Sequence, residues 1–172
     1  MITVRRIRSG EADLLKQVRL ASLQDAPYAF GAAYDLVSQR SDEDWREKAE
    51  STANGCDGAT FFVFSEEVPI GMAALFRIEG DVLTGEAVSK GQTEVGELIQ
   101  VWVAAEYRGT SAAWDLMNAI FKWAGENNFL RIIAGVTKGN VRAQQIYIKY
   151  GFSIMDKSSS NDSGGVYLEK QV

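Results

Sequence analysis

The sequence contains no histidine, and this absence excludes several common kinds of catalytic site. Without an imidazole there is no Ser-His-Asp triad, no Cys-His dyad and no histidine-ligated zinc. Any proton transfer must therefore use a carboxylate, a tyrosine, a lysine or water.

Cysteine is almost absent as well, because Cys56 is the only one in 172 residues. A single thiol rules out an intramolecular disulfide and a multi-thiolate metal site, and we predict that the protein holds no metal. Cys56 lies among Gly55, Asp57 and Gly58, which predicts a loop. No cation is evident beside it in the sequence that would activate the thiol as a covalent nucleophile.

Long apolar runs and an excess of positive charge are also missing. No run is long enough to span a membrane, and the charged N-terminal segment does not resemble a signal peptide. The 18 lysine and arginine residues are outnumbered by 23 aspartate and glutamate residues, and the net charge of −5 argues against a nucleic-acid binder. These observations predict a cytoplasmic protein that binds neither membranes nor nucleic acids.

The remaining composition is that of an ordinary globular protein. Hydrophobic residues make up 46% and charged residues 24% of the chain. At this length a single domain can bury a substantial core, so we predict one domain over residues 1–172.

The spacing of apolar residues predicts an alternation of strands and helices. In the first half, a strand at 2–7 precedes helices at about 11–24 and 42–51, and between them residues 28–31 lead into a second short helix that ends at about 39. Strands at 60–64 and 70–78 form a hairpin. In the second half, strands at 98–103 and 130–136 are each followed by a helix, and strands at 152–155 and 166–168 flank a loop at 157–165. Residues 79–95 predict a hairpin tip or insertion, and Ser41 with Asp44 predicts a capping box. This order favours a mixed α/β sheet with helices on both faces.

The junction between a strand and a helix within residues 97–124 is the most informative part of the chain. Residues 98–103 form an apolar and β-branched run, and the helix that follows is apolar on one face. Between them, residues 108–113 (RGTSAA) have small side chains that leave the backbone N–H groups at the helix start accessible. The helix dipole and the Arg108 guanidinium favour a di- or polyanion there. The alternative is an ordinary strand–turn–helix, since the segment matches neither a Walker loop nor a Rossmann loop.

A second motif follows about thirty residues further on, with Asn140, Ala143 and Tyr147 spaced along a predicted helix that ends before Gly151-Phe152. It resembles the N-x-x-A-x-x-x-Y-x-x-x-G-F signature of the GNAT superfamily of acyl-CoA-dependent N-acetyltransferases. Residues 108–113 resemble the Q/R-x-x-G-x-G/A pyrophosphate loop of the same superfamily, with Ser111 in place of the usual glycine. The two motifs occur in the right order and at the right distance.

This resemblance implies an α/β fold with a mixed, mostly antiparallel central sheet, helices on both faces, and central strands that splay apart around the acyl thioester. It also implies acetyl-CoA as the co-substrate and, by analogy, a possible homodimer. Asn140 would bind the pantetheine arm, cap the last helix, or do both. The other positions that correspond to the family's CoA-binding residues are the backbone of Val101 and Val103, and Arg108, Gly109, Thr110, Ser111, Ala112 and Ala113.

Acetylation of an amine needs a base, because a lysine-like amine with a pKa of roughly 10.4 is protonated at neutral pH. Glu97 is the candidate, six residues before Val103, where some members of the resembled family carry a catalytic glutamate. It is otherwise a strand-end glutamate in solvent, and Glu94 and Glu79 are nearby competitors. Tyr147 is the candidate acid for the CoA thiolate, or else a core tyrosine on the apolar stripe of its helix.

The site for the acceptor is the least defined part of the prediction. In the resembled family the first helices cover it, and here that region offers Tyr28, Phe30 and Asp25, which would hold a cationic amine or serve only for packing. We predict an acetyl-CoA-dependent N-acetyltransferase that moves the acetyl group directly to a primary amine of a small molecule or a protein. The alternative is a non-catalytic acyl-CoA-binding sensor or partner-binding module.

Overall fold

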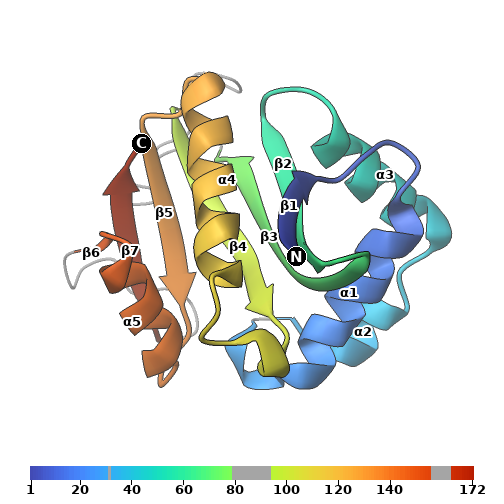
Figure 1. Ribbon diagram of the computed structural model, residues 1–172, viewed down its shortest axis with the longest axis horizontal. Helices are drawn as coiled ribbons and strands as arrows, with labels where there is room; N and C mark the ends of the chain where they lie inside the picture. The colour runs from blue at the N-terminus through green and yellow to red at the C-terminus, as the bar shows by residue number, and fades with distance from the viewer. Residues whose placement is uncertain (31, 79–93, 156–163) are drawn as a thin grey trace.

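The described residues of the computed structural model form one sheet with helices on both of its faces (Figure 1). The structure describes residues 1–30, 32–78, 94–155 and 164–172. Glu79 and most of the predicted insertion at 79–95 lie outside the described residues, as does most of the predicted loop at 157–165. No helix in the described ranges is long and apolar enough to cross a membrane.

The strands lie in the spatial order β1-β2-β3-β4-β5-β7-β6. Every neighbouring pair is antiparallel except β4 and β5, which run parallel, so the sheet is mixed and mostly antiparallel, as predicted. The strands are β1 (Ile2–Arg6), β2 (Gly58–Ser65), β3 (Val68–Arg77), β4 (Val95–Val103), β5 (Arg131–Val136), β6 (Ser153–Ile154) and β7 (Val166–Gln171).

The helices follow the predicted order. The predicted short helix after residues 28–31 is confirmed at Tyr34–Ser38, and the extended backbones of Phe30 and Ala33 separate it from the turn before it. The capping box is confirmed, since Ser41 Oγ accepts from the Asp44 N–H at 3.1 Å and the Asp44 carboxylate accepts from the Ser41 N–H at 3.1 Å. The helices are α1 (Ala12–Asp25), α2 (Tyr34–Ser38), α3 (Asp42–Ala53), α4 (Ala112–Glu126) and α5 (Val141–Lys149), with 3-10 turns η1 (Pro27–Ala29) and η2 (Ala105–Tyr107).

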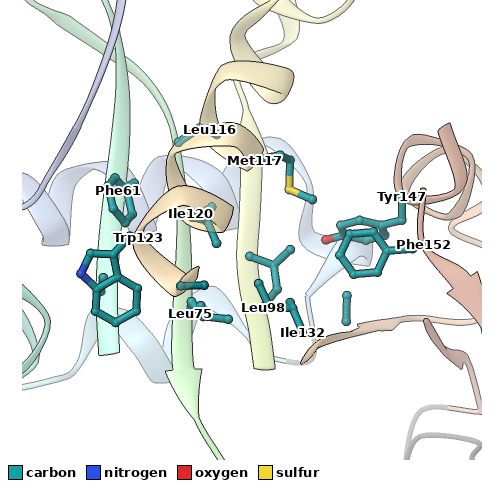
Figure 2. Packing of buried hydrophobic residues seen from close by; sticks show 14 of the residues in the cluster. Phe61, Leu75, Leu98, Leu116, Met117, Ile120, Trp123, Ile132, Tyr147 and Phe152 are labelled. Carbon is teal, nitrogen blue, oxygen red and sulfur yellow. The ribbon is translucent and has the colours of Figure 1, made fainter. Parts of the chain in front are cut away.

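Alternation along β2 sends large side chains to both faces of the sheet. Phe61 and Val63 pack on the face covered by α4, and Phe62 and Phe64 pack on the face covered by α1 and α3. Burial of each such side chain contributes roughly 1.5–3 kcal/mol. The α4 face also buries Leu75, Leu98, Leu116, Met117, Ile120 and Ile132 (Figure 2). This packing holds the start of α4 beside the end of β4, where the predicted phosphate-binding segment lies.

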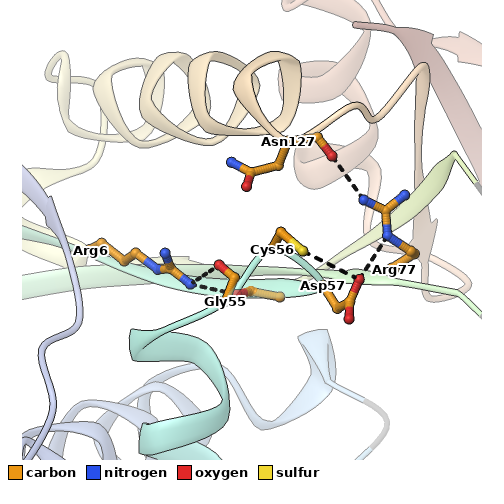
Figure 3. A network of polar contacts seen from close by, with 7 residues as sticks. Arg6, Gly55, Cys56, Asp57, Arg77 and Asn127 are labelled. Atoms are coloured by element: carbon orange, nitrogen blue, oxygen red, sulfur yellow. Dashed lines mark hydrogen bonds and ion pairs between the residues drawn. The ribbon is translucent and has the colours of Figure 1, made fainter. Parts of the chain in front are cut away.

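Two arginines tie surface loops to this framework (Figure 3). The Arg6 guanidinium donates to the carbonyl of Gly55 at 3.1 Å, and that of Arg77 donates to the carbonyl of Asn127 at 2.9 Å. Cys56 is exposed in a loop, as predicted. Arg6 lies close enough to interact with the thiol, and the residues that flank Cys56 in the sequence do not reveal this cation.

The central strands pair over only the first part of β4, from Val95 opposite Arg131 to Leu98 opposite Ala134. Gln100 then has a φ of 58°, and the register with β3 shifts at this point, so that two residues of β4 face one of β3. Such a bulge bends the strand that carries it. Beyond Leu98, β4 turns away from β5 and the central strands splay apart, as predicted (Figure 1).

Candidate active site

Two adjoining cavities lie where β4 and β5 separate. The loop cavity includes Arg108, Gly109, Thr110 and Ala113 from the segment before α4. The strand cavity runs along β4 past Glu97, and its volume of about 590 Å³ is within the range of roughly 300–1,000 Å³ that is usual for small-molecule sites. The two cavities share Ala29, Phe30, Val101, Asn140, Ala143 and Tyr147.

Most of the residues that the sequence assigned to a site thus meet in one place. Tyr28 and Val103 also line the loop cavity. Ser111 and Ala112 line neither cavity. The Ser111 hydroxyl donates to Asp115 Oδ2 at 2.7 Å, and the Ala112 side chain is fully buried in the core. Any contact of these two residues with a ligand would therefore come from their backbone.

The start of α4 has the properties of an anion site. The N-cap residue, Ser111, makes no side-chain cap hydrogen bond to this end of the helix. The Ala112 N–H has a weak partner in Thr110 Oγ1 at 3.3 Å, and the following N–H groups of the first turn have no intrahelical acceptor. Gly109 has a φ of +84° with nothing within 4 Å of its would-be Cβ, so the backbone here is open to a ligand. The helix dipole adds a partial positive charge.

Arg108 lines the loop cavity but is engaged with the protein. Its Nε donates to the carbonyl of Val103 at 3.0 Å, and its guanidinium forms an ion pair with Asp25. The Trp102 indole N–H donates to the same Asp25 carboxylate at 2.8 Å. Sequence reasoning assigned Arg108 to a phosphate and Asp25 to a cationic acceptor, and the structure pairs the two side chains with each other.

Arg142 is a second cation of the loop cavity, and sequence reasoning gave it no role. It lies in the first turn of α5, is exposed, and forms no ion pair with any described residue. Its position inside the second motif, two residues after Asn140, is the signal that would have identified it.

Asn140, at the start of α5, and Tyr147, within it, line both cavities. Asn140 Oδ1 accepts from the Ala143 N–H at 3.2 Å, so the predicted cap is confirmed, and the residue still lines both cavities. The Tyr147 ring packs against Phe152 with a centroid separation of 5.2 Å (Figure 2). Burial raises the pKa of the Tyr147 phenol, which therefore keeps its proton at neutral pH. A buried ring with a protonated hydroxyl at a cavity suits a proton donor.

Glu97 is the only carboxylate that the described residues bring into either cavity. It is half-buried on β4, and desolvation raises the pKa of its carboxyl group. Its competitor Glu94 is exposed and lines neither cavity. A desolvated carboxylate is a stronger base than an exposed one, which suits proton transfer from an ammonium group.

The proposed acceptor residues are engaged differently from what the sequence suggested. Tyr28 is 70% exposed at the edge of the loop cavity, and its carbonyl accepts from the Thr137 hydroxyl at 3.3 Å. Phe30 is half-buried, and the guanidinium carbon of Arg19 lies 4.6 Å from its ring centroid. Arg19 lines the strand cavity and had no predicted role. Its spacing from Leu15 places it on the buried face of α1, which is the signal that would have marked it.

Comparison with known proteins assigns this fold and site to a family. The model of the acetyltransferase (GNAT) family matches residues 20–152, so the chain belongs to the GNAT acetyltransferases. This match covers both sequence motifs and the strands β4 and β5.

Individual relatives agree with this assignment. Uncharacterized N-acetyltransferases of Mycobacterium tuberculosis and Mycobacterium bovis are 33% identical over 78 residues, which is 45% of this chain and 50% of each relative. The chain thus spans about half the length of the curated relatives it matches.

Solved structures share the fold over the whole chain. The PaiA N-acetyltransferase of Thermoplasma acidophilum, in complex with coenzyme A, superposes with a TM-score of 0.77 at 17% identity, covering 100% of this chain and 99% of that one. A GNAT acetyltransferase of Streptococcus pneumoniae gives 0.77 at 16% identity with the same coverage.

Proposed function

We propose that the protein is an acetyl-CoA-dependent N-acetyltransferase that moves the acetyl group directly to a primary amine in a ternary complex. The observation that carries this proposal is the pair of cavities at the divergence of β4 and β5. One reaches the uncapped start of α4, and the other reaches the half-buried Glu97. Family membership supports acetyl transfer, and the acceptor class and the residue roles are our proposal.

The loop cavity fits the co-substrate. The N–H groups at the start of α4 would receive the pyrophosphate, and Arg142 would add positive charge at the same cavity. Beyond Leu98, β4 has no β5 partner, so the backbone of Val101 is free to bind the pantetheine amides as an added strand would. Val103 contributes less, because its carbonyl already accepts from Arg108.

The cavity residues supply both proton transfers. Glu97 accepts a proton from the ammonium group, directly or through a water, and the neutral amine then attacks the thioester carbonyl carbon. The tetrahedral intermediate collapses with cleavage of the C–S bond, and the nitrogen releases its second proton to water to give the neutral amide. Tyr147 donates its proton to the leaving thiolate sulfur and regains one from solvent, and Glu97 returns its proton to solvent. The amide and CoA thiol are the products.

Direct transfer is supported by the position of the only thiol. Cys56 is exposed in the loop before β2 and lines neither cavity. A covalent acetyl-cysteine intermediate therefore has no nucleophile at the site, and the amine itself must attack the thioester.

The test combines thiol release with direct binding. Acetyl-CoA is incubated with amino acids, polyamines, aminoglycosides and short peptides, and free thiol is recorded while calorimetry measures CoA affinity. Thiol release that depends on an amine supports the proposal. Tight CoA binding without thiol release from any acceptor would instead indicate the non-catalytic sensor, and absence of CoA binding would contradict both functions.

A further inference from the structure

Arg19 is a buried cation without a counter-ion. The residue is 5% exposed, and its side chain lines the strand cavity. Its Nη1 donates to Ser22 Oγ at 3.3 Å, and the Phe30 ring faces the guanidinium. The buried Nε has no hydrogen-bond partner, and no carboxylate of the described residues forms an ion pair with this side chain.

An unpaired charge in this position is unfavourable for the unliganded protein. An arginine does not lose its proton in a protein, so the desolvation of its charge must be offset by partners. Burial, and then the nearby Arg40, lower the pKa of Arg19 to about 10, which shows that the surroundings do not stabilise the cation. Asp25, the last residue of α1, is engaged by Arg108 and Trp102.

The cavity that Arg19 lines also contains the candidate base. Glu97 and Arg19 both face the strand cavity and form no ion pair with each other. One group would attract an ammonium ion and the other an anion, in a space of small-molecule size. Opposite charges that remain apart in one cavity match a ligand that carries both charges.

We propose, on the basis of the proposed function, that the acceptor is a small amino-acid-like molecule whose carboxylate binds Arg19 while its amine faces Glu97. The planar guanidinium is a fork of N–H donors that matches one carboxylate, and the carboxylate supplies the counter-ion that the described residues do not provide. Polyamines and simple alkylamines lack the carboxylate and leave Arg19 unpaired. The charge of the acceptor, rather than the shape of its side chain, is then the main determinant of specificity.

The experiment compares each standard amino acid with its own carboxamide, which keeps the amine and the shape but removes the negative charge. Kinetics of thiol release are measured for the wild type, Arg19→Met, Arg19→Lys and the control Arg46→Met, which removes an exposed arginine of α3. We expect the wild type to prefer the carboxylate form by about 10- to 100-fold in kcat/KM, mostly through KM, as for a charged hydrogen bond. Arg19→Met should lose this preference, Arg19→Lys should recover part of it, and Arg46→Met should match the wild type.

A binding measurement separates this inference from the proposed function. Calorimetry with N-acetyl amino acids in the presence of CoA measures recognition of the carboxylate without turnover, and thermal unfolding verifies that each variant is folded. Wild-type binding that is lost in Arg19→Met supports the inference even if no acceptor is acetylated. Equal turnover of carboxylates and carboxamides overturns the inference and leaves the acetyltransferase proposal intact. An unchanged carboxylate preference in Arg19→Met, a loss of CoA affinity in that variant, or no binding of any N-acetyl amino acid also overturns it.

Discussion

Arg108 and Arg19 line adjoining cavities and differ in how their charges are satisfied. The Arg108 side chain is 24% exposed and has a carboxylate and a carbonyl as partners. Arg19 is 5% exposed and has one hydroxyl and an aromatic ring. Burial increases the need for partners, yet the more buried arginine has fewer of them. The Arg108 contacts are those of a residue that joins β4 to α1, and the Arg19 contacts leave room for a ligand.

The comparison extends to the carboxylates of the two sites. Asp25 is paired with Arg108 and accepts from Trp102. Glu97 faces the strand cavity with a raised pKa, and desolvation is the cause. Arg108 and Asp25 thus form an ion pair with each other, whereas Arg19 and Glu97 form no ion pair with any described residue. If this difference reflects function, removal of charges on the strand side should impair activity more than stability, and the reverse should hold for the Asp25–Arg108 pair.

The largest effect is expected for Glu97→Gln. Loss of a general base should lower kcat/KM by about 100-fold or more with little change in CoA affinity. Because burial raises the pKa of Glu97, the kcat/KM of the wild type should rise with pH, with a midpoint above the pKa of an exposed glutamate. This rise should be absent in Glu97→Gln. Thiol-release kinetics from pH 4 to 9 test both points, because this range begins below the ordinary glutamate pKa of about 4.3. A variant with the wild-type rate would remove Glu97 from the mechanism.

The same substitution should raise stability at neutral pH. A carboxyl group whose pKa is higher in the folded state favours folding at low pH, and this contribution is lost as the pH rises through the folded pKa. Urea unfolding should therefore show Glu97→Gln to be more stable than the wild type at pH 7, with the difference shrinking towards acid pH. A destabilised variant at pH 7 would mean that Glu97 has a stabilising partner.

A smaller kinetic effect is expected for Tyr147→Phe. The ring keeps its packing against Phe152, but the proton donor for the thiolate is lost, so turnover should fall by about 10- to 100-fold. CoA affinity and the melting temperature should remain close to those of the wild type, and Tyr150→Phe is a matched control on the same helix end. Equal turnover in the Tyr147 and Tyr150 variants would leave Tyr147 with packing alone.

The Asp25–Arg108 pair should affect stability. Asp25→Ala leaves the Arg108 guanidinium and the Trp102 indole N–H without this acceptor, and we expect a loss of about 1–3 kcal/mol in the free energy of unfolding. A double-mutant cycle with Arg108→Gln should give a coupling energy of about 1 kcal/mol by urea unfolding. Additive losses would show that the two side chains do not support each other.

The smallest effect is expected for the stability of Arg19→Met. The substitution removes an unpaired buried charge and keeps most of the apolar volume, while the cation–π contact with Phe30 is lost. The free energy of unfolding of the unliganded protein should be unchanged or higher by about 1 kcal/mol. A loss of more than about 1 kcal/mol would show that Arg19 is held for the fold and not for a ligand.

Sequence patterns predicted those features that depend on neighbouring residues. The capping box at Ser41, the cap at Asn140 and the order of the strands follow from local spacing, and the structure confirms them. The short helix after residues 28–31 was predicted in the same way, and the structure confirms it at Tyr34–Ser38.

The pairing of charges could not be predicted from the sequence. Asp25 and Arg108 are 83 residues apart, and each looked available for a ligand until the fold placed one beside the other. The spacing of Arg19 from Leu15 was the one signal for it, but an arginine in an amphipathic helix is usually assigned to solvent, so it received no role. Part of the motif at residues 108–113 lines the loop cavity, while the state of each charge there required the tertiary contacts.

The early end of the β4–β5 pairing has a mechanical consequence. The two halves of the sheet, β1–β4 and β5–β7–β6, are joined only by the pairing of residues Val95 to Leu98 with β5. A ligand that lies along the unpaired part of β4 and also contacts α5 would connect the two halves of the sheet. The amides of β5 and β7 should then exchange with solvent more slowly in the CoA-bound protein than in the unliganded protein.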